Sequence, residues 1–313
     1  MEKNVEDVVI VGAGISGLAT ALGLHRLGIR SLVVESGDSL RTSGFALGIW
    51  ANGWRALDAL GVGDYHYYIS KFGAYHFTTP FYSNTLLGDH ELRAVNRKVL
   101  LETLETELPK GTIRFSSKVV RIETDHHHHF NSIHLADGTV LQSKVLIGCD
   151  GVNSVVARFL GFSKPSFAGR SAVRGLVDFE NGHDFWELLW RNISKDNVCI
   201  AGDALHPMTP DLGQGGCAAL EDSIVLAGVL AEALKGKASE NEYQRLQKGL
   251  EKFARERRWR SFDLISTAYM VGFMQQSDGV VMNFVRDKIV AKFMAGMLLK
   301  KAGFDCGKLT VSS

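Results

Sequence analysis

The first thirty-five residues contain the feature that most restricts how this chain can fold. The run "VVIVGAGISG" places Gly12, Gly14 and Gly17 in a G-x-G-x-x-G pattern directly after a short apolar segment. Apolar residues then recur at helical spacing up to Gly28, which stands where a helix should end. The next run, "SLVVE", has the composition of a second strand. The pattern predicts a strand, turn, helix and strand in succession, which is the beginning of a parallel α/β sheet.

Such a turn predicts a dinucleotide site, because each glycine has a separate physical role. Gly12 permits the tight turn, Gly14 lets the backbone approach a pyrophosphate, and Gly17 lets the helix pack closely on the strand. The start of the helix offers unpaired N–H groups to the phosphates. Glu35 ends the second strand eighteen residues after Gly17, about where an acid binds ribose hydroxyls and disfavours a 2′-phosphate. We therefore expect FAD or NAD rather than NADP.

The composition excludes several other classes of protein. The 313 residues can bury a large core, and a net charge of +1 gives no support for nucleic acid as a partner. The four cysteines are widely spaced without a C-x-x-C pair, so neither a disulfide framework nor a zinc site is expected. No signal peptide or run of eighteen apolar residues is visible. We expect a cytoplasmic or organellar protein with no integral membrane span.

Two polar clusters suggest a binding role, and in both the sequence favours a structural one. His126 to His129 are adjacent in a hairpin connection and lack the spacing of metal ligands, so we expect a solvated turn and no metal. The basic run "RERRWR", residues 255–260, lies in a predicted helix of a chain with balanced charge. We interpret it as a solvated helix face rather than a nucleic-acid patch.

The rest of the chain alternates between helical and strand-like segments. Helices are expected at residues 51–61, 96–108, 216–235 and about 241–265. Consecutive strands are expected between about 111 and 149, with "ADGT" as a hairpin turn. The aromatic segment 65–93 also has strand composition. Residues 280–304 are amphipathic, which favours a helix packed on the main body over a membrane-surface or dimer contact.

Two later motifs separate FAD from NAD. "VLIGCDGVNSVVARFLG" is an apolar strand ending in Asp150 and Gly151, and "NVCIAGDALHPMTPDLGQGG" is another, ending in Gly202 and Asp203 before a glycine-rich turn. Together with "GAGISG", these ordered motifs resemble group A flavoprotein monooxygenases of the para-hydroxybenzoate hydroxylase type, especially the salicylate-hydroxylase-like FAD monooxygenases of plants. The segments 41–62 and 91–104 are similar to the same family.

The resemblance implies a set of cofactor contacts, and it implies no catalytic side chain. The cofactor-binding residues that it indicates are Gly12, Gly14, Gly17, Glu35, Arg97, Asp150, Asp203, Pro210, Gly213, Gln214, Gly215 and Gly216. The first three hold the pyrophosphate, Glu35 holds the adenosine ribose, and Arg97 contacts FAD. Asp150 bridges FAD and NAD(P)H binding, and Asp203 holds the ribityl chain. The turn from Pro210 to Gly216 faces the isoalloxazine ring, where N–H groups at a helix start stabilise negative charge.

Three residues in or beside these motifs receive no chemical role. His206 shapes its turn in the family, so we assign it no acid–base function. Cys217 stands where many relatives have asparagine, and we infer no redox role for it. Arg158 is displaced by one position from the family pattern, because Ala157 stands where the arginine should be.

The fold implied is a two-domain α/β protein with an incomplete second domain. We expect a discontinuous FAD-binding domain (1–64, 94–165 and 193–240), a remnant of an antiparallel substrate domain (65–93 and 166–192) and C-terminal helices (241–313). A five- or six-strand substrate sheet needs about 50 residues for itself. Little remains for it between the strand at 171–179 and "WELLWRN". The chain therefore resembles a family member with an internal deletion near residue 185; the alternative is a compact subfamily with a naturally small lid.

The function implied is that of an FAD-dependent monooxygenase. It would use NAD(P)H as a transient electron donor and O₂ to hydroxylate a small aromatic or lipophilic substrate. The shortened chain would bind FAD weakly and oxidise NAD(P)H without efficient hydroxylation. Two alternatives remain: a non-catalytic flavin-binding isoform that regulates a full-length monooxygenase, and an NAD-linked dehydrogenase, against which the "GDALHP" and "GQG" motifs argue.

Overall fold

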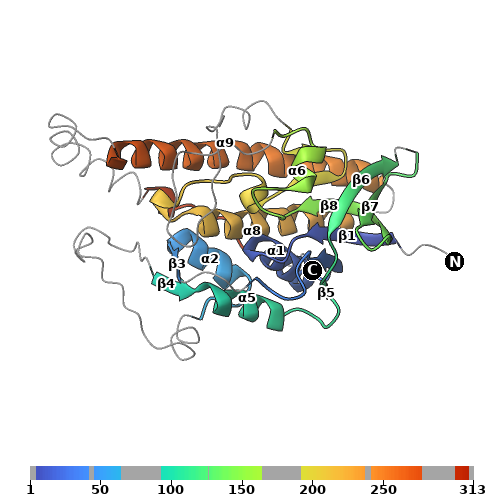
Figure 1. Cartoon of the computed structure of the whole chain (residues 1–313), viewed down its shortest axis with the longest axis horizontal. Coiled ribbons are helices and arrows are strands. Elements are labelled where there is room, and N and C mark those ends of the chain that lie inside the picture. The colour runs from blue at the N-terminus through green and yellow to red at the C-terminus, as the bar shows by residue number, and fades with distance from the viewer. Residues whose placement is uncertain are drawn as a thin grey trace.

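The computed structural model describes residues 5–41, 46–64, 93–125, 127–163, 192–236, 241–276 and 300–309. In this part of the chain the main sheet is largely parallel (Figure 1). Its strands, in spatial order, are β5 (Ile113–Arg114), β2 (Ser31–Val34), β1 (Val5–Val11), β8 (Val140–Gly148), β10 (Val198–Ile200) and β9 (Ser194–Lys195). The hairpin of β6 (Val119–Asp125) and β7 (Phe130–Leu135) joins the first half of β8 in antiparallel register. A second sheet pairs β3 (Ala46–Ile49) with β4 (Arg93–Asn96).

Strand β1 lies at the centre of the main sheet. Val8, Val9 and Ile10 are fully buried, as expected for a continuous apolar strand covered on both faces. The strand pairs in parallel with β2 on one side and with β8 on the other. The helix α1 (Ile15–Arg26) makes the crossover from β1 to β2. The strand–turn–helix–strand unit predicted from the glycine pattern is therefore confirmed.

The helices form layers beside this sheet (Figure 1). They are α1, α2 (Ala51–Ala59), α5 (Arg97–Thr106), α6 (Val155–Phe159), α8 (Gly215–Leu234) and α9 (Glu242–Gln276). Helix α8 packs between α1 and α9 and is apolar around most of its circumference, which suits a buried helix. Close approach of α1 and α8 depends on Gly23, because a Cβ there would lie 2.9 Å from the Cβ of Ala227.

Most of the expected elements are present, and the mixed α/β fold class is confirmed. The helices predicted at 51–61, 96–108 and 216–235 are α2, α5 and α8, and the "ADGT" turn joins β7 to β8. The charged helix is longer than predicted, because α9 continues to Gln276. Nearly all of the expected strand segment 65–93, the strand at 171–179 and most of the amphipathic segment 280–304 lie outside the described residues; residue 93 begins β4.

The histidine run forms the turn between β6 and β7 as far as it is described. The Asp125 carboxylate accepts hydrogen bonds from the backbone N–H groups of His127 and His128, at 2.9 and 3.0 Å. Both histidines are exposed, while His126 lies outside the described residues. Across the described ranges, no His, Cys, Asp or Glu side chains form a group of three able to hold a metal ion. Nor is any helix in those ranges sufficiently long and apolar to cross a bilayer.

Candidate functional site

Four neighbouring parallel strands end at one edge of the sheet, and each is followed by a predicted site residue. Strand β2 leads to Glu35, β1 to Gly12, β8 to Asp150 and β10 to Asp203. The chain leaves β1 toward β2 on one side, while β8 lies on the other side. Open α/β sheets bind ligands at such a switch point, outside the carboxyl ends of the strands. The fold therefore brings these residues together at the edge where a dinucleotide would be expected.

The glycine turn after β1 has the shape that a pyrophosphate site needs. Gly12 has a φ of +100°, and a Cβ on it would lie 2.5 Å from the carbonyl oxygen of Cys149. A Cβ on Gly17 would lie 1.9 Å from the carbonyl oxygen of Gly12. Gly14 differs, because within the described residues no atom beyond its chain neighbours lies within 4 Å of the Cβ position there. The turn is thus tightly packed toward the protein and open at Gly14, next to the N–H groups that begin α1, which fits a pyrophosphate.

Glu35 lies against this turn. Its Oε2 atom accepts a hydrogen bond from the backbone N–H of Ala13 at 2.8 Å, and Oε1 accepts one from Gly37 at 2.8 Å. The carboxylate therefore links the turn after β1 to the turn after β2. These contacts place the acid beside the glycine turn, while its predicted role in holding a ribose stays a prediction.

Asp150 lies on the opposite side of Gly12. Its carboxylate accepts hydrogen bonds from the Ser154 hydroxyl at 2.5 Å and the Val155 N–H at 2.6 Å, which holds the start of α6. Burial raises its pKa, and these two donors partly offset that rise. A Cβ on Gly12 would lie 3.0 Å from the Asp150 Cα, so the two turns are in contact. The described geometry gives this carboxylate a structural task at the edge of the site.

Asp203 lies in a short 3-10 helix, η1 (Gly202–Ala204), that follows β10. Gly202 has a φ of +61°, and a Cβ on it would lie 2.7 Å from the Cβ of Ser16 in α1. This turn is therefore pressed against the beginning of α1, close to the glycine fingerprint. Asp203 itself is exposed, so its carboxylate is available to a ligand at the same edge.

The glycine-rich turn before α8 approaches the same place. It contains η2 (Pro210–Leu212), Gly213 with a φ of +60°, and Gln214 as the N-cap of α8. A Cβ on Gly216 would lie 4.0 Å from the side chain of Ile15, so α8 and α1 begin side by side. The Gln214 side chain is buried, and its Oε1 accepts a hydrogen bond from Asn52 of α2 at 2.9 Å. Backbone groups, rather than this side chain, are left to face a ligand.

Arg97 is the first residue of α5, and it contacts the segment after β2 rather than the glycine turns themselves. Its Nη1 donates to the carbonyl oxygen of Arg41 at 2.6 Å, which ties α5 to the segment after β2. The preceding strand β4 pairs with β3, and Leu47 of β3 lies 4.0 Å from the Cβ position of Gly216. The second sheet thus borders the start of α8 and carries Arg97 at its margin.

The cysteines have no reactive character in this geometry. All four are free thiols, and Cys149, Cys199 and Cys217 are buried. Burial raises the pKa of Cys149 and of Cys217 to about 12, so neither forms a thiolate near neutral pH. The absence of a redox role inferred for Cys217 agrees with this.

One group of buried ionic side chains was missed by the sequence analysis. The run at 255–260 is not a solvated face throughout: Trp259 is 64% exposed, but the Arg257 side chain is 0% exposed and that of Arg260 only 10%. The prediction was wrong for these two arginines because both pair with carboxylates inside the protein. A signal was available in the sequence, because Arg257 continues the helical spacing of the apolar residues Leu246, Leu250 and Phe253.

The partners of these arginines are adjacent acids on α8. Arg257 donates from Nε to Asp222 at 2.6 Å and from Nη2 to Glu221 at 2.7 Å. Asp222 also lies 2.7 Å from Nε2 of His206, which is completely buried. Burial alone would raise the pKa of Asp222, but the charges of His206 and Arg257 lower it to about 2. Conversely, burial would lower the pKa of His206, and the Asp222 carboxylate outweighs that effect and raises it.

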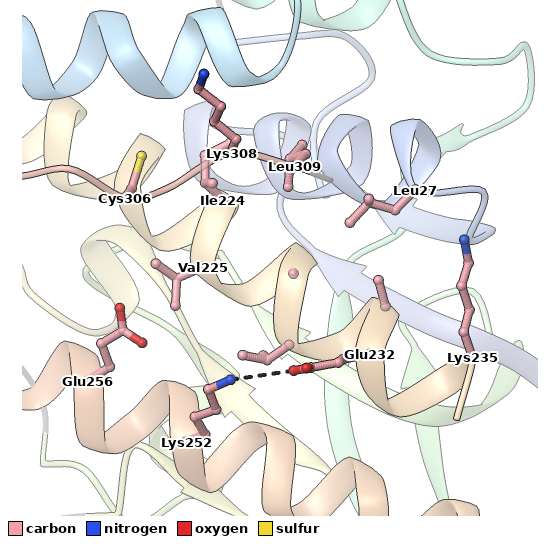
Figure 2. A pocket seen from close by; sticks show the side chains of 13 residues that line it. Leu27, Ile224, Val225, Glu232, Lys235, Lys252, Glu256, Cys306, Lys308 and Leu309 are labelled. Atoms are coloured by element: carbon pink, nitrogen blue, oxygen red, sulfur yellow. Dashed lines mark hydrogen bonds and ion pairs between the residues drawn. The ribbon is translucent and has the colours of Figure 1, made fainter. Parts of the chain in front are cut away.

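A cavity of about 300 Å³ lies elsewhere, between α8, α9 and the segment 306–309 (Figure 2). It is lined in part by Val225, Cys306 and Leu309, and a Lys252–Glu232 ion pair of 3.4 Å spans one side. The α8 residues that line it, such as Val225 and Glu232, come from the middle and end of that helix, whereas the glycine-rich turn lies at its beginning. The cavity is therefore separate from the dinucleotide edge.

Comparison with known proteins agrees with this geometry. The chain matches the FAD binding domain family model in two pieces, residues 6–188 and 178–261. Monooxygenase 2 of Arabidopsis thaliana is 43% identical over 407 residues, covering 98% of this chain and 99% of the relative. Monooxygenase 1 of the same plant is 32% identical over 400 residues, covering 96% and 99%.

Solved structures share the fold at lower identity. Klebsiella pneumoniae HpxO complexed with FAD and uric acid has a TM-score of 0.70 at 17% identity, covering 95% of this chain and 96% of that chain. A salicylate hydroxylase substrate complex has a TM-score of 0.66 at 17% identity, covering 95% and 98%. Both likenesses concern the arrangement of the backbone.

The alignment with Monooxygenase 2 also shows how many positions of that relative have no counterpart in this chain. Its 407 aligned positions exceed the 313 residues of this chain by 94, so at least that many positions have no counterpart here. The two pieces of the family match meet within residues 178–188. Since the family model covers most of the chain, and the relative almost all of it, the chain belongs to the FAD-dependent monooxygenases built on this FAD binding domain, with FAD as the cofactor.

Proposed function

We propose that this chain is an FAD-dependent monooxygenase that takes electrons from NAD(P)H and uses O₂ to hydroxylate a small aromatic or lipophilic molecule. We further propose that its shortened substrate domain makes hydroxylation inefficient. The observation that carries the proposal is the edge where Gly12, Asp150 and Asp203 follow three adjacent parallel strands. Bound FAD supplies the redox chemistry, and the protein supplies position and electrostatics.

Each part of the edge has a proposed task. The backbone at Gly12, Gly14 and Gly17 and the start of α1 hold the pyrophosphate, and the Glu35 carboxylate accepts hydrogen bonds from ribose hydroxyls. Asp203, which is exposed, holds the ribityl chain. Arg97 contacts FAD from the margin of the second sheet. Asp150 shapes the turn where FAD and NAD(P)H binding meet.

The turn before α8 has the electrostatic task. After the turn of Pro210 and Gly213, the residues Gln214, Gly215 and Gly216 present backbone N–H groups at the beginning of a twenty-residue helix. The positive end of the helix dipole stabilises negative charge on a reduced flavin ring. No side chain is required to transfer a proton in this scheme.

The substrate class is supported by the related structures. HpxO is complexed with uric acid and the salicylate hydroxylase with its substrate, and both share this fold. Planar ring molecules of that size fit a flavin-dependent hydroxylation. We propose an activated aromatic ring, or a lipophilic molecule of similar size, as the substrate here.

We place the missing positions in the substrate domain. The family match divides into two pieces that overlap at residues 178–188, and the alignment leaves at least 94 positions of Monooxygenase 2 without counterpart. We propose the domain division given above, with 65–93 and 166–192 as the remnant of that sheet and 241–313 as C-terminal helices. A flavin covered by so little protein is open to water, which diverts reduced flavin from hydroxylation.

The test is to purify the chain and measure three quantities. We expect flavin absorbance after addition of FAD, oxidation of NAD(P)H, and hydrogen peroxide in large excess over hydroxylated product. A colourless protein that takes up no added FAD contradicts the cofactor contacts. Tightly coupled turnover contradicts the proposed loss of the substrate sheet.

The proposed shortening of the substrate domain also favours a second function. A chain with a complete FAD-binding edge and a shortened substrate domain could regulate a full-length monooxygenase without catalysing the reaction. Mixing it with a full-length relative should then change the turnover of that relative. A Gly17→Ala variant serves as the control, and normal hydroxylation by the purified chain alone contradicts this function.

A further inference from the structure

Arg257 of α9 joins two carboxylates that lead to two different turns of the FAD site. Its Nε donates to Asp222 at 2.6 Å and its Nη2 to Glu221 at 2.7 Å. These acids are consecutive on α8, and all three side chains are fully buried. A single guanidinium therefore orients both carboxylates, as its forked donors allow.

Asp222 leads to the turn after β10. Its Oδ2 accepts a hydrogen bond from the backbone N–H of Gly202 at 2.9 Å and lies 2.7 Å from His206 Nε2. Gly202 directly precedes Asp203, the exposed acid at the dinucleotide edge. The position of Asp203 is thus set by a carboxylate that Arg257 orients.

Glu221 leads to the turn before α8. Its Oε1 accepts a hydrogen bond from Asn52 Nδ2 at 2.6 Å, and the same amide donates to Gln214 Oε1 at 2.9 Å. Arg260 supports this acid from α9 with bonds of 2.7 and 3.1 Å. Gln214 is the N-cap of α8, so this branch sets the start of the helix whose N–H groups face the site.

The members of this group compensate one another only when the whole group is assembled. Two buried carboxylates face two guanidinium groups and, at Asp222, the His206 imidazole. Both guanidinium groups also lie over the ring of Phe304, at 5.1 and 4.7 Å from its centroid. Replacing one member leaves an uncompensated buried charge, which is more costly than replacing an oppositely charged pair. Comparing a single replacement with a paired one therefore distinguishes a role of Arg257 in overall stability from a role in positioning.

We propose that Arg257 is a positioning residue for FAD: through Asp222 and Glu221 it holds the turn at Gly202 and the turn at Gln214 in the arrangement that FAD requires. The inference rests on the FAD site proposed above. It assigns a function to a side chain of α9 that lies outside every glycine-rich motif.

The first test compares a charge-balanced double variant with wild type. Arg257→Met combined with Asp222→Asn removes one charge of each sign and leaves the Glu221–Arg260 pair intact. We expect a melting temperature within about 5 °C of wild type, and an FAD dissociation constant raised at least ~10-fold in a fluorescence titration of FAD. If FAD affinity recovers together with the melting temperature, Arg257 serves stability alone and the proposal is wrong.

A milder variant keeps the test decisive if the double variant fails to fold. Asn52→Ala cuts the link from Glu221 to Gln214 while leaving every charge in place. We expect about a tenfold loss of FAD affinity, with a fall in melting temperature that is smaller than that of Arg257→Met because no charge is left uncompensated. An FAD dissociation constant within twofold of wild type overturns the proposal. The exposed Arg255→Met variant on the same helix is the matched control and should bind FAD as wild type does.

A third measurement separates this proposal from the FAD assignment itself. Amide hydrogen exchange is followed without FAD in peptides containing Gly202 and Gln214. We expect faster exchange near Gln214 in Asn52→Ala, and near both residues in the double variant, but not in Arg255→Met. Unchanged exchange contradicts the positioning role. Failure of wild type to bind FAD contradicts the proposed function, whereas the exchange result tests Arg257 independently.

Discussion

Two regions meet at the FAD edge and are built in opposite ways. The turn at Gly12, Gly14 and Gly17 consists of backbone, and its shape follows from the absence of side chains. The ionic group behind it consists of side chains from α2, α8 and α9 that touch only when those helices pack. We propose that the first region offers N–H groups to FAD and that the second holds in place the turns that offer such groups.

This contrast shows which parts of a site can be recognised from the sequence and which cannot. A glycine turn is a local device, because its residues are within six positions and a strand and helix adjoin them. Arg257 contacts Asp222 across 35 positions of sequence, and neither residue belongs to a recognisable pattern with the other. The following predictions test whether the two regions are as separable as this comparison suggests.

The largest effect is expected in the ionic group. Arg257→Met leaves Asp222 and Glu221 buried with one guanidinium fewer, so we expect the free energy of unfolding to fall by about 3–5 kcal/mol. The control Arg255→Met, at an exposed position one half-turn away, should change it by less than about 0.5 kcal/mol. Urea denaturation of both variants measures the difference. Equal effects would contradict the buried ion pairs.

The next effect concerns the glycine turn, where two neighbouring glycines should behave differently. A Cβ on Gly17 would collide with the carbonyl oxygen of Gly12 at 1.9 Å, so Gly17→Ala should destabilise the fold by about 3 kcal/mol and abolish FAD binding. Gly14→Ala meets open space, so it should leave the melting temperature nearly unchanged.

Gly14→Ala should still weaken FAD binding, because the methyl group occupies the space that the pyrophosphate approaches. We expect an FAD dissociation constant at least ~10-fold higher, measured by fluorescence titration. A Gly14→Ala variant that binds FAD normally would show that the ligand does not approach the backbone here.

A smaller, pH-dependent effect should come from His206. Its pKa is raised in the folded protein by the Asp222 carboxylate, so the stability it contributes is complete below its ordinary pKa of 6.5 and is lost as pH rises through the raised value. We expect wild type to exceed His206→Gln by about 2 kcal/mol near pH 5.5, and by less as pH rises. Urea denaturation at several pH values measures this, and a difference that grows with pH would contradict the ion pair.

The contribution of Asp222, the acid of the same pair, depends on pH in the opposite direction. The pKa of Asp222 is lowered from 3.8 to about 2, so its contribution is present above 3.8 and is lost as pH falls toward 2. Stability should therefore decline on both sides of the mildly acidic range. Urea denaturation of wild type at several pH values between about 2 and 5 measures this decline.

The smallest effect is expected at Glu35, a side chain that bonds to the backbone of the glycine turn. Glu35→Gln keeps the shape but replaces one accepting oxygen by a donor, which opposes the N–H of Ala13 or Gly37. We expect a loss of about 1 kcal/mol in stability and about a tenfold weaker binding of FAD. Isothermal titration with FAD and thermal melting test both. The Ser36→Ala variant, which touches the same carboxylate from solvent, should change neither appreciably.

The sequence alone determined the elements whose causes are local. It predicted the β1–α1–β2 unit, the helices α2, α5 and α8, and the hairpin before β8, because glycine position and apolar spacing act over a few residues. The resemblance supplied the family and FAD, and both are confirmed. The roles of the individual site residues stay predictions.

Only the tertiary structure decided which side chains are enclosed between helices. The run at 255–260 reads as a charged helix face in sequence, yet packing of α9 on α8 buries Arg257 against two acids. Packing of α2 on α8 likewise turns the Gln214 side chain toward Asn52 instead of toward a ligand. Composition could not show this, because a charged side chain is buried only where a distant partner of opposite charge compensates its lost hydration.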